Sequence, residues 1–162
     1  FSALSAFSAV NVWFRLFATY GPEDDELHLI PTVIRELLAG KVPRLTPGEQ
    51  QWDYLYVDDA IEALYRVAFN SQENGIYNLG SGNVHTIREI VEKIRNRIDP
   101  ALELGFGEIP YWTDELMHLQ ADISHLQKIT NWSPKVGLEE GLERTLECYR
   151  THPSHEDLRL HC

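Results

Sequence analysis

The chain has 162 residues, a net charge of −11 and 43% hydrophobic residues. This length fits one domain of average size, and the apolar content excludes a disordered chain. The charge disfavours nonspecific contact with nucleic acid or an anionic membrane, so we expect neither as a partner. The longest apolar run, residues 3–14, is too short for a bilayer span, which needs about 20 residues. Two cysteines are too few for a disulfide framework and favour a reducing, cytoplasmic compartment.

The first residues predict a helix that has no cap. Phe1, Leu4 and Phe7 have helical spacing, yet no capping residue, initiating methionine or basic signal region precedes them. We therefore expect the chain to be a fragment of a longer protein.

Helices and strands are predicted to alternate along the rest of the chain. The patterns predict, in order, a buried strand at 11–18, a helix at 29–39, short strands at 43–48 and 53–57, a helix at 60–69, a strand at 75–79, a helix at 87–98, a strand at 101–106 and helices at 122–129 and 138–149. The clearest boundaries are Pro31 in the first turn of one helix, Gly40 after its end, and a Thr86/Glu89 capping box before another.

This alternation predicts an α/β fold with a partly parallel sheet. The strands are few and short, which indicates the second half of a doubly wound sheet with a small appended lobe. We expect residues 1–150 to form one domain and residues 151–162 to form a flexible tail.

One glycine cluster has the position of a ligand-binding loop. Residues 80–82 (Gly-Ser-Gly) follow a predicted strand and precede a predicted helix. Free backbone amides there could bind a phosphate or a sugar hydroxyl. A plain tight turn explains the same residues equally well.

Metal binding and paired-acid chemistry receive little support from the sequence. The C-terminal residues that could bind a metal do not match zinc spacing, and we predict no metal site; they are His152, His155, His161 and Cys162. Asp58 and Asp59 stand where a helix starts, which favours capping and dipole roles over acid catalysis. Packing is the simplest role for the four tryptophans, although Trp52 and Trp112 lie beside polar loops and could stack on a base or a sugar.

Five segments, in order, resemble the extended short-chain dehydrogenases/reductases, the NAD-dependent epimerase/dehydratase family that modifies nucleotide sugars. Residues 15–22 (RLFATYGP) resemble its R-x-F-N-x-Y-G-P element, and residues 48–60 (GEQQWDYLYVDDA) its G-x-Q-x-R-D-Y-x-Y-V-x-D element. The other three segments are residues 29–41 (LIP…GK), 75–82 (GIYNLGSG) and 131–142 (NWSPKVGLEEGL). The resemblance implies the C-terminal half of a Rossmann-like NAD(P)-binding fold with a small α/β substrate-binding lobe.

The resemblance also implies motifs that these residues do not contain. The family binds NAD or NADP through G-x-x-G-x-x-G and uses a Tyr-x-x-x-Lys pair, whose tyrosine acts as the base. Neither motif occurs here, because no tyrosine is followed four residues later by lysine. We expect both motifs to precede Phe1, and we predict no catalytic residue in this chain.

The resemblance assigns ligand contacts to particular positions. Residues at the nicotinamide end of the cofactor would be Phe17, Ala18, Thr19 and Tyr20. Residues that bind a nucleotide-diphospho-sugar would be Leu29, Ile30, Pro31, Leu45, Trp52, Asn83 and Trp112.

Three positions depart from the family pattern. Ala18 replaces an asparagine, and Trp52 and Trp112 replace arginines that clamp the diphosphate. Lys41 and Arg44 are the nearest substitutes for these lost cations.

Two functions remain open from the sequence. The first is the substrate-binding half of an NAD(P)-dependent nucleotide-sugar epimerase, dehydratase or reductase that acts by hydride transfer at a sugar carbon. The alternative is a noncatalytic, truncated or pseudoenzyme chain that binds a sugar nucleotide or a protein partner. In the second case the missing half-sheet would expose an apolar strand edge at residues 11–18, which favours a homodimer.

Overall fold

The computed structural model describes residues 11–70 and 74–152. Its elements are β1 (Val12–Leu16), β2 (Ala18–Tyr20), α1 (Leu29–Leu38), β3 (Arg44–Leu45), β4 (Gln51–Tyr56), α2 (Val57–Asn70), β5 (Gly75–Leu79), β6 (Val84–Thr86), α3 (Ile87–Ile98), β7 (Gly105–Phe106), β8 (His118–Leu119), α4 (Ser124–Thr130) and α5 (Leu138–Thr151). The alternation confirms the predicted α/β class. The helix expected at residues 1–7 and most of the expected tail lie outside the described residues.

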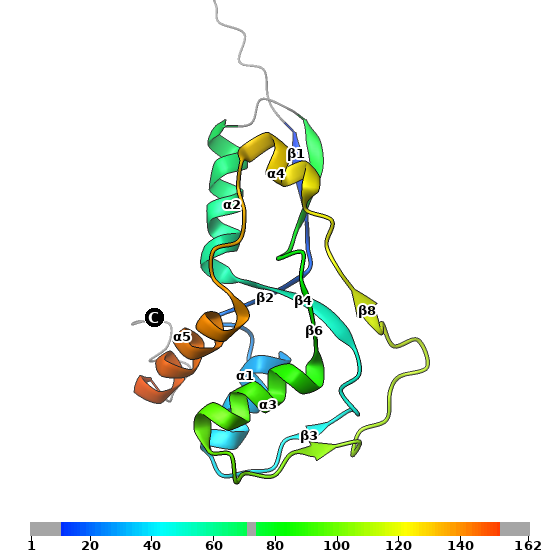
Figure 1. Cartoon of the computed structure of the whole chain (residues 1–162), viewed down its shortest axis with the longest axis vertical. Helices are drawn as coiled ribbons and strands as arrows, with labels where there is room; N and C mark the ends of the chain where they lie inside the picture. The colour runs from blue at the N-terminus through cyan, green and yellow to red at the C-terminus, as the bar shows by residue number, and fades with distance from the viewer. Residues whose placement is uncertain (1–10, 71–73, 153–162) are drawn as a thin grey trace, which may run out of the picture.

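The molecule is elongated, and two hydrophobic clusters occupy its two ends (Figure 1). At one end β1 pairs in parallel with β5. Helices α2 and α4 cover one face of this pair, the face that carries the buried side chains of Tyr77 and Leu79. The buried residues that fill the space between the strands and the helices include Leu55, Ala63, Val67, Tyr77, Leu79, Leu126 and Trp132. This end has the layered arrangement expected for half of a doubly wound sheet.

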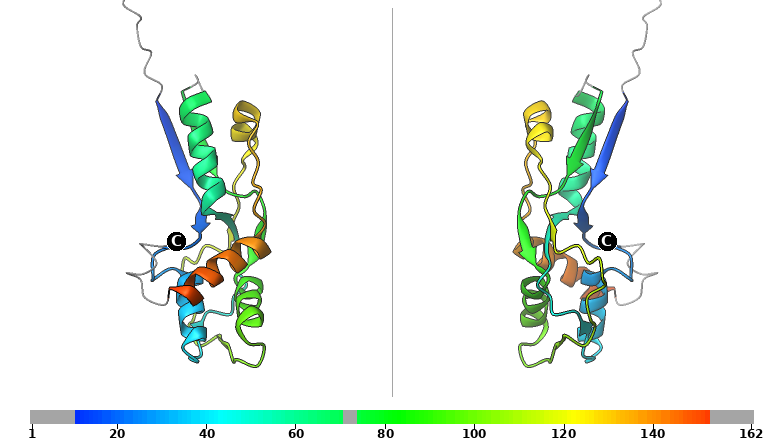
Figure 2. Two further views of the ribbon diagram at one scale, coloured as in Figure 1. Left: turned by 90° about the vertical axis from the view of Figure 1, so that its left-hand side faces the viewer. Right: turned by 90° about the vertical axis from the view of Figure 1, so that its right-hand side faces the viewer.

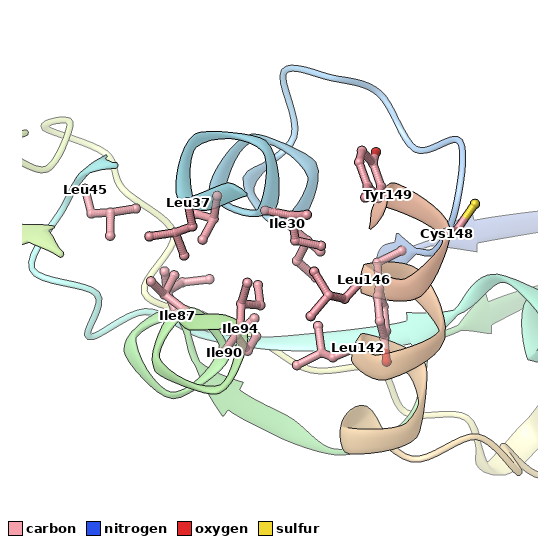
Figure 3. Close-up of a cluster of buried hydrophobic side chains, with 14 of the residues drawn as sticks. Ile30, Leu37, Leu45, Ile87, Ile90, Ile94, Leu142, Leu146, Cys148 and Tyr149 are labelled. Atoms are coloured by element: carbon pink, nitrogen blue, oxygen red, sulfur yellow. The ribbon is translucent and has the colours of Figure 1, made fainter. Parts of the chain in front are cut away.

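At the other end helices α1, α3 and α5 pack together as a small lobe (Figure 2). Their buried side chains point toward one another in Figure 3, and they include Ile30, Leu37, Ile90, Ile94, Leu142 and Leu146. Each such side chain contributes about 1.5–3 kcal/mol by leaving water. The lobe therefore has a core of its own, as the sequence predicts for an appended substrate-binding lobe.

Strand β4 connects the two ends. It pairs in parallel with β2 and β8 and antiparallel with β6. Short strands β3 and β7 form a separate parallel pair at the lobe. Because β4 contacts segments from both ends, its side chains lie where a site between the two units can form.

Local sequence signals explain the helix boundaries. Thr86 and Glu89 form the predicted capping box, in which Glu89 N–H donates to Thr86 Oγ1 at 3.1 Å and Thr86 N–H to Glu89 Oε2 at 2.9 Å. Pro31 lies in the first turn of α1, where its missing N–H would have no helical partner. Gly40 follows the end of this helix with a φ of 67°, which a glycine adopts without strain.

Three predicted strands differ from the structure. The one expected at 43–48 is confined to Arg44–Leu45. The strand expected over residues 101–106 is confined to Gly105–Phe106, because a turn held by Asp99 occupies the preceding residues. The strand within residues 11–18 is present but is not buried: Trp13 is 72% exposed and Leu16 is 58% exposed. Among the described residues β1 pairs with β5 alone, so its other edge has no neighbouring strand.

Helix α5 approaches the sheet closely at Gly141. A Cβ atom at this position would collide with Tyr20, lying 2.8 Å from Cζ of its ring, and would lie 2.9 Å from Cδ2 of Tyr56. Tyr20 itself is buried, and its hydroxyl donates to the carbonyl of Leu138 at 3.4 Å. The absence of a side chain at Gly141 therefore sets the spacing between α5 and the two tyrosines.

We predict that Gly141→Ala lowers the free energy of unfolding by about 1–3 kcal/mol, because a methyl group overpacks this contact. Urea denaturation followed by circular dichroism measures the change. Gly137→Ala is the control, since a Cβ there meets no atom within 4 Å, and it should cost less than about 1 kcal/mol. Equal effects of the two substitutions would contradict the packing argument.

Candidate functional site

A cavity of about 250 Å³ lies between β2, the start of α1 and β4. The residues predicted as ligand contacts that line it are Phe17, Ala18, Thr19, Leu29, Ile30 and Trp52. Its other lining residues are Asp24, His28 and Tyr54. The structure thus brings predicted cofactor residues and predicted substrate residues to one place.

The remaining predicted residues lie elsewhere. Tyr20, Pro31 and Leu45 are buried in the core of the lobe or beside it, and none of them lines this cavity. Asn83 lines a second cavity of about 180 Å³ near the start of α5. Trp112 is 79% exposed, on the loop between β7 and β8. Tyr54 lines both cavities and therefore lies between them.

Aromatic side chains from β4 form one wall of the first cavity. The rings of Trp52 and Tyr54 are stacked, with their centroids 6.4 Å apart and an angle of 28° between their planes. The indole Nε1–H of Trp52 donates to the carbonyl of Leu116 at 2.9 Å, which fixes the orientation of the ring. Such a wall suits the flat face of a base or the C–H face of a sugar.

The hydroxyl of Tyr54 is a hydrogen-bond donor at physiological pH. Burial raises its pKa well above the ordinary value of a tyrosine, and the negative charge of Asp24 raises it further. The phenol therefore stays protonated beside the cavity, where it can donate to a ligand oxygen.

The loop before α1 adds two polar side chains that the sequence analysis did not identify. Nδ1 of His28 lies 2.7 Å from Oδ1 of Asp24, and the same oxygen accepts the backbone N–H of Asp25 at 2.8 Å. In the sequence these residues form only an acidic loop with a histidine. The one sequence feature that points to a contact between Asp24 and His28 is their separation by four residues just before a helix, and this separation alone does not indicate a cavity.

The glycine loop at residues 80–82 does not offer free amides. The backbone N–H groups of Ser81 and Gly82 donate to the carboxylate of Asp53 at 2.6 and 2.8 Å. The hydroxyl of Ser81 and the N–H of Ala121 donate to the same carboxylate at 2.6 and 3.1 Å. Of the two interpretations left open by the sequence, the structure therefore favours the tight turn, because a buried aspartate of the chain already occupies these donors.

Asp58 and Asp59 do not form a pair of acids. Asp59 is buried and accepts the backbone N–H groups of Lys135 and Val136 at 2.9 and 2.8 Å. Asp58 is exposed and lies 3.4 Å from Nη1 of Arg144. Asp59 therefore lies in the first turn of α2, as predicted, and it also holds the segment before α5 through these two hydrogen bonds.

The cations proposed as substitutes for the family arginines are not at the cavity. Arg44 is exposed and lies 3.3 Å from a carboxylate oxygen of Glu108. Lys41 is also exposed, and neither residue lines the cavity. The described wall of this site therefore contains aromatic and acidic groups but no arginine or lysine.

Residues 11–70 and 74–152 contain neither a metal-ligand cluster nor a membrane-spanning helix. No group of three or more His, Cys, Asp or Glu side chains in these ranges could hold a metal ion. No helix within them is both long and apolar enough to cross a bilayer. The C-terminal histidines from His155 onward lie outside these ranges.

Comparison with known proteins shows which family the chain resembles. Residues 4–80 match the NAD dependent epimerase/dehydratase family. The chain is 31% identical over 146 residues to UDP-glucuronic acid decarboxylase 1 of Arabidopsis thaliana, covering 88% of this chain and 33% of that protein. It is 32% identical over 137 residues to dTDP-glucose 4,6-dehydratase 1 of Escherichia coli (strain K12), covering 80% of this chain and 38% of that protein.

The chain is thus similar to members of the NAD-dependent epimerase/dehydratase family over most of its length, and the family model matches residues 4–80. Solved structures agree: dTDP-glucose 4,6-dehydratase from Bacillus anthracis, in complex with NAD, superposes with a TM-score of 0.79 and 25% identity, covering 86% of this chain and 44% of that one. UDP-glucose 4-epimerase with UDP-glucose from Thermotoga maritima superposes with a TM-score of 0.78 and 25% identity, covering 88% of this chain and 47% of that one. The Rossmann-like prediction is thus confirmed, and the chain spans less than half the length of these relatives.

We predict that Asp53→Asn lowers the free energy of unfolding by about 3 kcal/mol. Both carboxylate oxygens of Asp53 accept hydrogen bonds from N–H groups. In asparagine one of these oxygens becomes an NH₂ group, so whichever way the amide is turned, one NH₂ group faces N–H donors and cannot accept from them. Urea denaturation measures the loss. Asp114→Asn, in an exposed loop, is the control and should change stability by less than about 0.5 kcal/mol. A stable Asp53→Asn variant would show that these hydrogen bonds are not needed.

Proposed function

We propose that this chain forms the nucleotide-sugar-binding part of an NAD(P)-dependent epimerase, dehydratase or reductase. The observation that carries the proposal is the single cavity in which Phe17, Ala18 and Thr19 meet Leu29, Ile30 and Trp52. The resemblance assigns the first three to the cofactor and the others to the substrate. Hydride transfer requires these two ligands in contact, and one cavity that both groups line fits that requirement.

The residues of this chain would orient the ligands rather than carry out the chemistry. The apolar side chains of Leu29 and Ile30 would contact the nucleotide, and Trp52 would stack on a ring of the substrate. In this proposal Tyr20, Pro31 and Leu45 support the cavity from the core, while Asn83 and Trp112 contact the substrate from neighbouring loops. Binding energy from the nucleotide would place the sugar carbon for reaction.

The described residues of this chain fit only the nicotinamide end of the cofactor. Phe17, Ala18 and Thr19 offer a small, mostly apolar wall of the kind that suits a nicotinamide ring. The glycine loop cannot hold the pyrophosphate, because Asp53 already occupies its amides. When bound, NAD or NADP would supply the hydride acceptor and donor.

A noncatalytic binding role is the alternative. It rests on the absence of Tyr-x-x-x-Lys and G-x-x-G-x-x-G from the 162 residues. The first function requires binding of a sugar nucleotide and turnover by the complete enzyme, whereas the alternative requires binding of a sugar nucleotide or a protein partner and no turnover. Turnover by these 162 residues alone would contradict the prediction that they contain no catalytic residue.

We expect the chain to bind UDP-glucose or dTDP-glucose in isothermal titration calorimetry and to bind NAD(H) weakly at most. Trp52→Ala should weaken sugar-nucleotide binding by about tenfold, because a buried aromatic contact is lost. Trp52→Phe keeps an aromatic face but loses the bond to Leu116, so it should retain most of the affinity. Trp13→Ala, on an outer sheet face, is the control. Tight NAD binding, or equal losses from Trp52→Ala and Trp13→Ala, would contradict the proposal.

For the noncatalytic alternative we also propose that the edge of β1 that has no neighbouring strand among the described residues mediates self-association, as a homodimer. Trp13 of β1 pairs in register with Ile76 of β5, and these side chains are 72% and 52% exposed. Adjacent apolar groups beside an unpaired strand edge favour contact with another strand.

Sedimentation velocity over a dilution series tests this contact. Trp13→Lys should shift the chain toward the monomer, because a buried charge at the contact is unfavourable. Trp112→Lys introduces the same charge at a tryptophan that is 79% exposed and lies on a distant loop, so it should leave association unchanged. A wild-type chain that is monomeric at all concentrations would contradict the proposal.

A further inference from the structure

The loop before α1 places a carboxylate and an imidazole side by side on the wall of the first cavity. Asp24 and His28 both line this cavity, and Nδ1 of His28 lies 2.7 Å from Oδ1 of Asp24. The family resemblance assigns no role to either residue. The side chain of His28 caps no helix amide, although the residue is the N-cap of α1. A structural role in the helix therefore does not explain the imidazole.

The contact between the two side chains determines what they can offer a ligand. An ionised carboxylate only accepts hydrogen bonds, so the neutral imidazole carries its proton on Nδ1 and leaves Nε2 as an acceptor. Oδ1 of Asp24 takes the donors from His28 and from the N–H of Asp25. The pair can thus offer two acceptors to a ligand, Oδ2 of Asp24 and Nε2 of His28. Neighbouring hydroxyl groups of a sugar are the matching donors.

The charge around the pair disfavours an anionic group. Glu23, Asp25 and Glu26 lie in the same loop as Asp24. The nearest arginine of α1, Arg35, is held by Glu26 with an N–O distance of 2.6 Å. A ligand carboxylate beside Asp24 would therefore meet like charges without a free cation to compensate them.

The aromatic wall from β4, which lines the same cavity, suits a sugar ring. Trp52 and Tyr54 present stacked aromatic rings, and the hydroxyls of Tyr54 and Thr19 can donate to ring or hydroxyl oxygens. Phe17 and Thr19, the residues assigned to the nicotinamide end, line the same cavity. The sugar that reacts, rather than the ribose of the nucleotide, must lie next to the nicotinamide.

We propose that the Asp24–His28 pair binds neighbouring hydroxyls of a neutral hexose seated against Trp52, and that it selects against a uronic acid at the same place. This inference rests on the proposed function and adds the class of sugar. It distinguishes the chain from the relative named for UDP-glucuronic acid, whose sugar carries a carboxylate. Specificity here comes from repulsion of the wrong ligand as well as from hydrogen bonds to the right one.

Calorimetric titration of the full chain with UDP-glucose and with UDP-glucuronic acid tests this selection, because the two ligands share their nucleotide. The wild type should bind UDP-glucose about tenfold more tightly. Asp24→Asn should reduce this preference to about twofold by removing the repulsion. Asp25→Asn removes the same charge from the same loop at a residue that does not line the cavity, and it should keep the preference.

His28→Phe tests the second acceptor. It should weaken the affinity for UDP-glucose by about fivefold, through the loss of a hydrogen bond, and leave the affinity for UDP unchanged. Equal affinities of the wild type for the two sugars, equal effects of Asp24→Asn and Asp25→Asn, or a loss of UDP binding in His28→Phe would each overturn the inference while leaving the proposed function intact. Failure of the wild type to bind any sugar nucleotide would instead overturn the proposed function, and this inference with it.

Discussion

The carboxylate of Asp53 joins three segments that are distant in the chain. It is fully buried on β4 and accepts hydrogen bonds from Ser81, Gly82 and Ala121. A buried charge is tolerated only when its oxygens are satisfied, so the loops after β5 and β8 must keep their positions around it. The same contact explains Gly80, since a Cβ there would lie 2.8 Å from Oδ2 of Asp53.

This anchoring of β4 determines where the candidate site forms. The residues on either side of Asp53 along the strand, Trp52 and Tyr54, both line the first cavity. Strand β2 lies beside β4 in the same sheet, with Ala18 paired with Tyr54, and it contributes Ala18 and Thr19 to the same cavity. The start of α1 closes the remaining side, because the core of the lobe holds Ile30 in place (Figure 3). The site thus depends on both hydrophobic clusters and on the strand that joins them.

The sequence predicts the elements well where the signal is local. The capping box at Thr86 and the apolar spacing of α1 depend on residues a few positions apart, and both were predicted. Long-range partners are not visible in this way. The exposure of Trp13 depends on which strands lie beside β1, and the amides of residues 80–82 are taken by Asp53, which lies 28 positions before Ser81. The Asp24–His28 pair was missed for a related reason, since only the fold shows that it faces a cavity.

The strand pairing also determines the order in which the chain can fold. Val12 pairs with Gly75, Arg44 with Gly105 and Gln51 with His118, so three parallel pairings join residues more than 60 positions apart. Closing such loops before any contact forms slows folding. During synthesis on the ribosome, β1 cannot pair until β5 has been made, and the pairing of β4 is incomplete until β8 has been made. During synthesis, apolar strands such as β1 therefore remain unpaired for many residues, and folding of this chain competes with aggregation.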